Sequence, residues 1–338
     1  MSVWRTLAAL LLVASAVPCV SAESAAPAPK APKYVIHWVL AHEPAGVFAR
    51  AAHEFGRLVN KESNGDIVVK VIHVAKFGNR GYVSPRYAMH AVETGRYEMT
   101  QDYTTALGHA SHPLWVLDMP YLFRDHAHAA KVLDGPIGRQ LLAGLPPSMK
   151  GLAFTYSGGY RILPTLSREI HTPADVKGLR VRTAPTPVAE ATLRALGAVP
   201  VPADITDINK LVKEGKIDGG ESTLARYADG QGSALPIINV TKHSLFLTAV
   251  IVNTKFYDSL PKRDQEAVDR AADQMAHDER TDTIQANIDE EKSARSKGET
   301  VVTLTPQEQA EFVQAVQPVY KEFTPRFHGL VQRIEQTR

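Results

Sequence analysis

The fold is decided by the stretch Lys177–Ser222, which reads KGLRVRTAPTPVAEATLRALGAVPVPADITDINKLVKEGKIDGGES. Its opening residues, Gly178–Thr183, alternate apolar side chains with arginines, and this pattern predicts a strand with guanidinium groups on one face. Thr186 and Pro187 are typical of a helix start, and Gly197 is typical of a helix end. The stretch therefore begins with a strand followed by a helix.

The second half of the stretch continues the alternation. It predicts a short strand over Ala198–Val201, a helix over about Thr206–Glu214 and a third strand over Lys216–Gly219. Strands and helices that alternate in this way form an open parallel sheet, and ligands bind such sheets at the carboxyl ends of the strands. The expected fold class is therefore α/β with a ligand crevice.

The N-terminal third predicts a second unit of the same kind. A strand over Tyr34–Ala41, a helix over Gly46–Glu62 and a strand over Asp66–Val74 give an opening β-α-β unit. Farther on, a helix over Tyr87–Glu93 precedes a short strand over residues 97–100. Two α/β units agree with the length of 338 residues and the 44% hydrophobic content.

Charge and cysteine content exclude several classes of protein. The chain has 38 basic and 36 acidic residues, so no large basic field favours nucleic acid or an anionic membrane. Residues 1–22 combine Arg5, an apolar run and the small-residue site Val20-Ser21-Ala22, which predicts a cleavable secretory signal peptide; the alternative is an N-terminal membrane anchor. Residues 23–33 predict a flexible tether. The only cysteine, Cys19, would leave with the signal peptide, so the mature chain can perform no cysteine chemistry.

Seven short motifs then occur in a fixed order between Tyr34 and Phe327. They are Asn64-Gly65, Leu117–Phe123, Gly159-Tyr160-Arg161, Thr172–Gly178, Gly178–Arg182, Leu196-Gly197-Ala198 and Gly215–Glu221. Together they make the chain resemble the solute-binding proteins of TRAP transporters.

The resemblance implies a two-domain periplasmic binding protein, type II-like, with a ligand cleft between the domains, hinge strands and a long helix that spans both domains. We expect domain I over 34–158 and 248–287, domain II over 159–247 and 288–338, and hinges near Gly158-Gly159 and Val240–Leu247. The long helix is expected over Pro261–Lys297, unless it divides into two near Asp282, and an amphipathic helix over Pro306–Arg326 closes the chain.

The resemblance also implies the binding residues. Arg182 and Arg161 match arginines that contact the ligand in the family, and a planar guanidinium fits a carboxylate in a two-pronged ion pair. Tyr103 follows a strand end, and Glu221 belongs to the Asp-Gly-x-Glu motif. The chain departs from its family at Ser222, where many members have an asparagine, and at Asn209, where many have an aromatic residue.

Both departures remove bulk, so they predict a carboxylate larger than a simple C4-dicarboxylate, or one with a polar group near Ser222. The alternative is that Ser222 only caps a turn. His42, Glu43 and Pro44 are further candidates in the loop after the first strand, although a solvated loop is the simpler interpretation. The pairs His109/His112 and His126/His128 lack a completing ligand at suitable spacing, so we expect no metal and no cofactor.

The resulting hypothesis is a non-enzymatic periplasmic subunit that captures a small organic acid and delivers it to TRAP membrane subunits, with no stable membrane insertion of the mature chain. Two alternatives remain. One is a ligand-sensing binding protein that partners a sensor kinase. The other is a secreted two-domain enzyme, which is disfavoured because the sequence has no Gly-x-Ser-x-Gly elbow, no P-loop and no metal-ligand set.

Overall fold

The computed structural model describes residues 31–41, 46–73 and 84–338, and Pro32–Arg338 form one compact unit. The predicted signal peptide, nearly all of the tether and the loop candidates His42, Glu43 and Pro44 lie outside the described residues.

A six-stranded sheet has the order β2-β1-β3-β10-β4-β8. Its strands are β1 (Tyr34–Leu40), β2 (Ile67–Ile72), β3 (Met99–Tyr103), β4 (Met149–Ile162), β8 (Ser222–Thr223) and β10 (Leu245–Asn253). β1 runs parallel to β2 and β3, whereas β10 runs antiparallel to β3 and β4. All nine residues of β10 are buried, which explains its nearly continuous apolar sequence, because a central strand covered on both faces has no polar side.

The stretch that decided the expected fold forms a three-stranded parallel sheet. β5 (Arg180–Thr183) lies between β6 (Val199–Pro202) and β7 (Gly219–Gly220). The connections are α7 (Pro187–Ala195), the short 3-10 helix η3 (Ile205–Asp207) and α8 (Ile208–Lys213). Thr186 caps α7 by accepting a hydrogen bond from the Ala189 backbone N–H at 3.2 Å. The predicted β-α-β-α-β order is confirmed.

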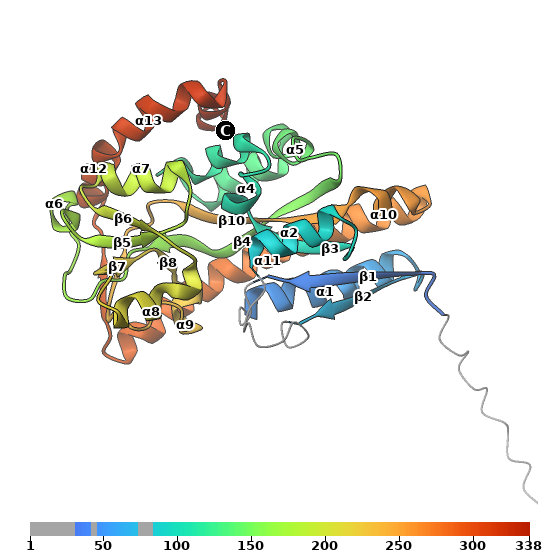
Figure 1. Cartoon of the computed structure of the whole chain (residues 1–338), viewed down its shortest axis with the longest axis horizontal. Coiled ribbons are helices and arrows are strands. Elements are labelled where there is room, and N and C mark those ends of the chain that lie inside the picture. Colours follow the sequence, from blue (N-terminus) through green and yellow to red (C-terminus); the bar gives the residue numbers. More distant parts are fainter. Residues whose placement is uncertain (1–30, 42–45, 74–83) are drawn as a thin grey trace, which may run out of the picture. The chain divides into compact units, whose positions relative to one another are not determined.

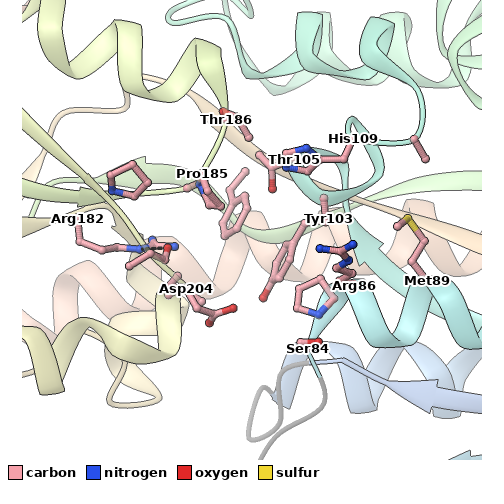
Figure 2. Close-up of a pocket in the computed structure, with 18 residues that line it drawn as sticks. Ser84, Arg86, Met89, Tyr103, Thr105, His109, Arg182, Pro185, Thr186 and Asp204 are labelled. Atoms are coloured by element: carbon pink, nitrogen blue, oxygen red, sulfur yellow. Dashed lines mark hydrogen bonds between the residues drawn. The ribbon is translucent and has the colours of Figure 1, made fainter.

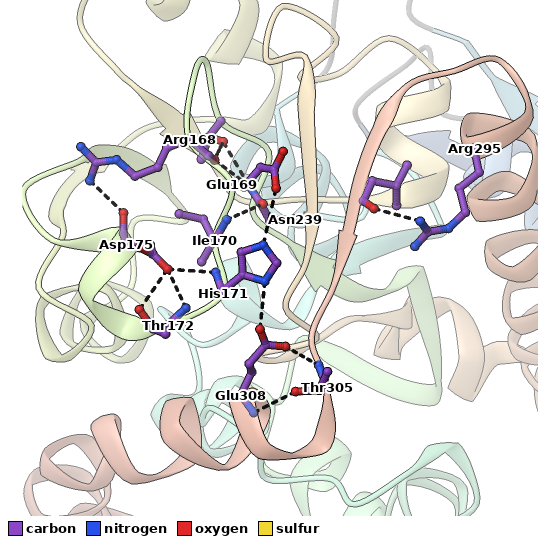
Figure 3. Close-up of polar contacts among 12 residues, drawn as sticks. Arg168, Glu169, Ile170, His171, Thr172, Asp175, Asn239, Arg295, Thr305 and Glu308 are labelled. Atoms are coloured by element: carbon purple, nitrogen blue, oxygen red, sulfur yellow. Dashed lines mark hydrogen bonds and ion pairs between the residues drawn. The ribbon is translucent and has the colours of Figure 1, made fainter.

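The third sheet has two parallel strands, β9 (Ile237–Val240) and β11 (Thr300–Thr303). Asn239 holds the neighbouring loop, because its Oδ1 accepts from the Ile170 N–H (Figure 3) and its amide donates to the Leu163 carbonyl oxygen, both at 2.9 Å. Beside it, His171 Nδ1 lies 2.9 Å from Glu308 Oε1. These contacts join residues 163–171 to β9 and to the C-terminal helices.

The remaining helices surround these strands (Figure 1). They are α1 (Gly46–Glu62), α2 (Pro85–Glu93), α3 (Thr104–Leu107), the 3-10 helix η2 (His112–Asp118), α4 (His126–Asp134), α5 (Pro136–Ala143), α6 (Pro173–Val176), α9 (Leu224–Ala228), α10 (Thr254–Ser259), α11 (Lys262–Ser296), α12 (Pro306–Ala315), α13 (Gln317–Phe323), the 3-10 helix η4 (Thr324–Phe327) and α14 (Leu330–Glu335).

Two large hydrophobic clusters form the core. One packs β1 against α1 and α11; it includes Met275 of α11, and the rings of Trp38 and Phe55 are centred 5.3 Å apart. The other includes Leu193 of α7 and Phe323 of α13. The amphipathic faces of the helices are therefore buried against the strands, and this burial supplies the main driving force for folding.

The expected hinge glycines lie inside β4, where the strand departs from regular pairing. The register with β10 changes from Leu247 opposite Tyr156 to Phe246 opposite Gly159. Gly158 has φ +88°, and a Cβ built there would lie 2.2 Å from Thr223 Oγ1. Only glycine fits this position, because the backbone is left-handed and Thr223 occupies the space of a side chain.

The helix α11 is 35 residues long and unbroken, so the alternative of two helices is wrong. It lies against β4 and α1, and three of its side chains bond the β4 backbone: Glu279 accepts from the Tyr156 N–H, and Arg280 and Asn287 donate to carbonyl oxygens. At 1.5 Å per residue its length is about 52 Å. Among the described residues, no helix combines the length and apolar character needed to cross a membrane.

The C-terminal segment corrects one expectation. A single helix was expected over Pro306–Arg326, but α12 ends at Ala315, and α13 begins at Gln317. Pro318 explains the break, because it has no N–H to continue the hydrogen bonds of α12 and fits the first turn of a new helix. The last turn of this segment is the 3-10 helix η4.

Candidate functional site

A cavity of about 690 Å³ opens at the carboxyl ends of β3 and β5. Arg182 and Asp204 lie on one side of it, and Tyr103, Arg86 and His109 lie on the other (Figure 2). This is the edge at which sheets of this kind bind their ligands. The volume falls in the range that accommodates a small molecule.

Arg182 is the buried cation of the cavity. It is 3% exposed, its Nε donates to the Ala203 carbonyl oxygen at 2.9 Å, and its Nη1 donates to the Glu221 carbonyl oxygen at 3.2 Å. Within the described part of the chain, Nη2 has no hydrogen-bond partner. Burial lowers the pKa of Arg182 to about 10, so the guanidinium stays charged near neutral pH. A fixed, charged donor therefore faces the cavity.

Arg161 lies behind the cavity wall and does not line the cavity itself. Its guanidinium lies 4.0 Å from the centre of the Phe246 ring, which does line the cavity, and it is 1% exposed. Nη2 donates to Asp118 Oδ1 at 3.2 Å, and Asp118 Oδ2 accepts from the hydroxyl of Thr186, another lining residue. Its Nε and Nη1 have no hydrogen-bond partner in the described structure. Buried donors left unpaired are costly, so a ligand group or water is expected to satisfy them.

Glu221 holds these two arginines in place. Its side chain accepts from Thr183 and from His243 Nε2 at 2.8 Å, and one oxygen lies 3.8 Å from Arg161 Nη1. Burial alone would raise the pKa of Glu221, but the charge of Arg161 and the bonds from His243 and Thr183 lower it to about 2. The ionised carboxylate does not line the cavity and is occupied by protein donors.

Tyr103 lines the cavity from the end of β3. Its ring stacks on Phe246 at 4.8 Å, and its hydroxyl accepts a hydrogen bond from Arg226 Nη2. Arg226 is 1% exposed and also donates to Ser157 Oγ at 3.0 Å, next to the bulge of β4. Burial raises the pKa of Tyr103, so its hydroxyl keeps its proton.

Ser222 and Asn209 do not line the cavity. The Ser222 hydroxyl donates to the Gln231 carbonyl oxygen at 3.1 Å. The Asn209 amide donates to the Gly230 carbonyl oxygen at 2.7 Å and its Oδ1 accepts from the Ala234 N–H. Both side chains hold the loop after α9, and their part in ligand recognition stays a prediction.

The histidine pairs have separate environments. His109 lines the cavity, whereas His112 stacks on Trp115 at 4.9 Å. His126 Nδ1 lies 3.1 Å from the Tyr156 hydroxyl, and His128 Nε2 donates to the Ile334 carbonyl oxygen at 2.8 Å. The described residues contain no group of three His, Cys, Asp or Glu side chains placed to hold a metal ion.

Sequence reasoning missed three residues of this region: Arg226, Phe246 and Asp204. Arg226 occurs in a short polar helix and Asp204 at an ordinary helix cap, so neither carries a local signal of burial or cavity lining. Phe246 occurs in an apolar strand, where an aromatic side chain is unremarkable. Only the pairing of β10 with β3 and β4 brings it to the arginines.

Open α/β sheets bind ligands at the carboxyl ends of their strands, and a buried arginine in a cavity there suits an anionic ligand. Comparison with known proteins gives the family: residues 41–326 match the bacterial extracellular solute-binding proteins of family 7, and the chain belongs to this family. The family is one of solute-binding transport proteins. The fold is therefore that of a two-domain α/β periplasmic binding protein.

Individual proteins agree with this assignment. The chain is 31% identical over 284 residues to a solute-binding protein of Verminephrobacter eiseniae, which covers 82% of this chain and 81% of the relative. It is 27% identical over 294 residues to the C4-dicarboxylate-binding protein DctB of Bacillus subtilis, covering 86% and 81%. The solved TRAP periplasmic solute binding protein of Ochrobactrum anthropi superimposes with a TM-score of 0.80 at 26% identity, covering 90% of this chain and 94% of that one.

Proposed function

We propose that this chain is the extracytoplasmic subunit of a TRAP transporter and that it captures a small organic acid in the cavity of Figure 2. The observation that carries the proposal is Arg182, a buried cation whose Nη2 has no partner among the described residues. A planar guanidinium binds a carboxylate in two parallel hydrogen bonds, a geometry that lysine cannot reproduce.

Arg161 supports the same proposal, although it lies behind the residues that line the cavity. Its guanidinium lies beside the Phe246 ring, its Nε and Nη1 have no hydrogen-bond partner in the described structure, and Asp118 connects it to Thr186 in the cavity lining. When an acid enters and the cleft closes, we expect these donors to reach it directly or through water. Glu221 acts in this scheme as a positioning group for the arginines rather than as a ligand contact.

Closure is the step that would trap the ligand. We propose that domain I (34–158 with 248–287) and domain II (159–247 with 288–338) move about two hinges, at Gly158-Gly159 and within Val240–Leu247. The left-handed glycines and the change of register between β4 and β10 support the first hinge, because a bulged, glycine-containing strand can absorb a change in backbone angles.

The proposal includes a periplasmic location reached through a cleaved signal peptide, and delivery of the acid to the TRAP membrane subunits. It also implies binding without chemical change, so the acid should be recovered unaltered from the complex. The family match supports a transporter subunit over the sensor-kinase alternative, because a solved protein of the same fold is described as a TRAP periplasmic solute binding protein.

The test is an Arg182→Lys variant with Arg180→Lys as its control. Arg180 occupies the same strand two residues earlier, is exposed, and pairs with Asp218 outside the cavity. A thermal-shift screen of C3–C6 mono- and dicarboxylates, keto acids and aromatic acids would identify a ligand, since binding to the native state raises the melting temperature. Calorimetry would then give the dissociation constants.

We expect Arg182→Lys to weaken binding by about 30-fold or more, because losing one partner of a desolvated charge pair costs about 2–5 kcal/mol. Arg180→Lys should stay within about twofold, because an exposed ion pair contributes little. Binding by Arg182→Lys within a factor of about two would refute the proposed role of this arginine.

A further inference from the structure

Arg226 is a buried cation that the proposed capture of an acid by Arg182 does not use. It belongs to α9 and is 1% exposed. Its hydrogen-bond partners among the described residues are neutral: Nη2 donates to the hydroxyls of Tyr103 and Ser157, and Nη1 donates to Gln231 Oε1. Its Nε has no partner in that part of the chain. A guanidinium bonded only to neutral oxygens is costly to keep away from water, so the protein buries this cation at a cost.

The contacts of Arg226 cross the boundary between the two proposed domains. Arg226 belongs to domain II as proposed above, whereas Phe48, Tyr103 and Ser157 belong to domain I. The guanidinium carbon lies 5.0 Å from the centre of the Phe48 ring and 5.5 Å from that of Tyr103, and Nη2 lies 3.0 Å from Ser157 Oγ. One side chain of domain II therefore meets three elements of domain I, namely α1, β3 and β4.

The backbone of α9 is held at the same place. The Thr223 hydroxyl donates to the Ser157 carbonyl oxygen at 3.2 Å, and its Oγ1 accepts from the Arg226 backbone N–H at 3.4 Å. Ser157 directly precedes Gly158, the first residue of the proposed hinge. Because Tyr103 lines the cavity from domain I, opening the cleft about this hinge would move the Tyr103 hydroxyl away from Arg226.

Tyr103 also connects Arg226 to the proposed acid site. Its ring stacks on Phe246 at 4.8 Å, and the Arg161 guanidinium lies 4.0 Å from the centre of the Phe246 ring. Tyr103 and Arg182 face the same cavity (Figure 2). An anion held by Arg182 would therefore lie near Arg226, and its negative charge would reduce the cost of burying a second cation. Ligand binding and the contacts of Arg226 should stabilise each other.

We propose that Arg226 is a positioning residue that holds the cleft closed: it keeps Tyr103 and Ser157 of domain I against α9 of domain II while an acid occupies the cavity. This inference rests on the proposed function and on the proposed domains. Contacts between the domains form after the ligand has entered the cleft. They should therefore slow the release of the ligand more than they change its entry.

The experiment removes the contacts of Arg226 separately. Arg226→Gln removes the whole guanidinium, Ser157→Ala removes one contact to domain I, and Gln231→Ala is the matched control. Ser157 Oγ and Gln231 Oε1 each lie 3.0 Å from a nitrogen of the same guanidinium, but Gln231 belongs to the same domain as Arg226. Stopped-flow fluorescence with succinate, pyruvate and D-glucuronate as probes would give the association and dissociation rate constants. Circular dichroism would check that each variant is folded.

We expect Arg226→Gln to raise the dissociation rate constant of a bound probe by about tenfold or more and Ser157→Ala to raise it by about threefold, because hydrogen bonds to a charged group are the stronger ones. Association rate constants should stay within about threefold of the wild type. Gln231→Ala should change neither rate constant by more than about twofold. The double variant of Arg226→Gln and Ser157→Ala should match Arg226→Gln within about twofold, because its serine contact is already absent.

Dissociation rate constants of Arg226→Gln and Ser157→Ala within about twofold of the wild type would overturn this inference, and so would equal effects of Ser157→Ala and Gln231→Ala. In either case the wild type still binds a probe through Arg182, and the proposed function stands. If Arg226→Gln does not fold, the comparison of Ser157→Ala with Gln231→Ala decides. A wild-type protein that binds none of the three probes would overturn both the inference and the proposed function.

Discussion

A buried carboxyl on the long helix gives a sharp prediction about stability. Glu279 of α11 is 8% exposed, accepts from the Tyr156 N–H of β4 at 2.8 Å and accepts from the Thr283 hydroxyl at 3.0 Å. Burial raises its pKa from 4.5 to about 7, although these two hydrogen bonds and the charge of Arg280 act in the opposite direction. The folded protein therefore keeps a proton that the unfolded chain releases above pH 4.5.

The sign of the pH dependence follows from this difference. Because the pKa is higher in the folded state, the contribution to stability is fully present below pH 4.5 and is lost as pH rises through about 7. The separation between 4.5 and about 7 corresponds to about 3 kcal/mol, at about 1.4 kcal/mol for each pKa unit. Most of the loss is expected between pH 5 and pH 8.

The perturbation is Glu279→Gln, which resembles the protonated carboxyl in shape and removes its titration. Urea unfolding of both proteins at several pH values would give the difference in their free energies of unfolding. We expect the wild-type protein to lose about 2–3 kcal/mol relative to the variant between pH 5 and pH 8. Because other titrating groups are common to both proteins, their effects cancel in the difference.

Glu290→Gln is the matched control on the same helix. Its side chain is only partly buried, and we expect its difference from the wild type to change by less than about 0.5 kcal/mol, as for other surface substitutions. A Glu279→Gln difference that is constant with pH, or one in which the wild type becomes relatively more stable as pH rises, would contradict the reasoning.

Two further predictions concern the proposed hinge. Gly158→Ala should lower the free energy of unfolding, measured in urea, by more than the roughly 1–2 kcal/mol that a left-handed backbone costs alanine, because the new Cβ would also lie 2.2 Å from Thr223 Oγ1. Gly178→Ala is the control: Gly178 has φ +77°, and a Cβ built there has no atom within 4 Å, so this variant should show the conformational cost alone. Saturating ligand should lower the radius of gyration measured by small-angle X-ray scattering, and an unchanged radius would argue against closure about Gly158-Gly159 and Val240–Leu247.

The sequence predicted the secondary structure well where local signals were strong. Thr186, Pro187 and Gly197 mark the two ends of α7, and the order of strands and helices over Lys177–Ser222 agrees with the parallel sheet β6-β5-β7. The family also followed from short motifs in order along the chain. The prediction of one C-terminal helix was wrong, because Pro318 ends the hydrogen bonding of the first helix and lies in the first turn of a second one.

The site was less accessible, because a sequence states which groups a chain has but not which of them face one another. The alternation of residues predicted Arg180 and Arg182 on one face of β5. Only the tertiary structure shows that Arg180 is exposed and pairs with Asp218, whereas Arg182 is buried at the cavity. Likewise, Glu221 stands beside Ser222 in a motif, but contacts with His243 and Arg161, distant in sequence, occupy its carboxylate.

By itself the sequence determined the elements, the family and the arginine that could hold an acid, since these depend on local propensity and on motif order. The tertiary structure alone decided that Asp204 shares the cavity with Arg182 and that Glu279 is buried against β4. The physical reason is that burial and the distance between charges arise from the packing of segments far apart in the chain, and these two quantities determine pKa values and ligand selectivity.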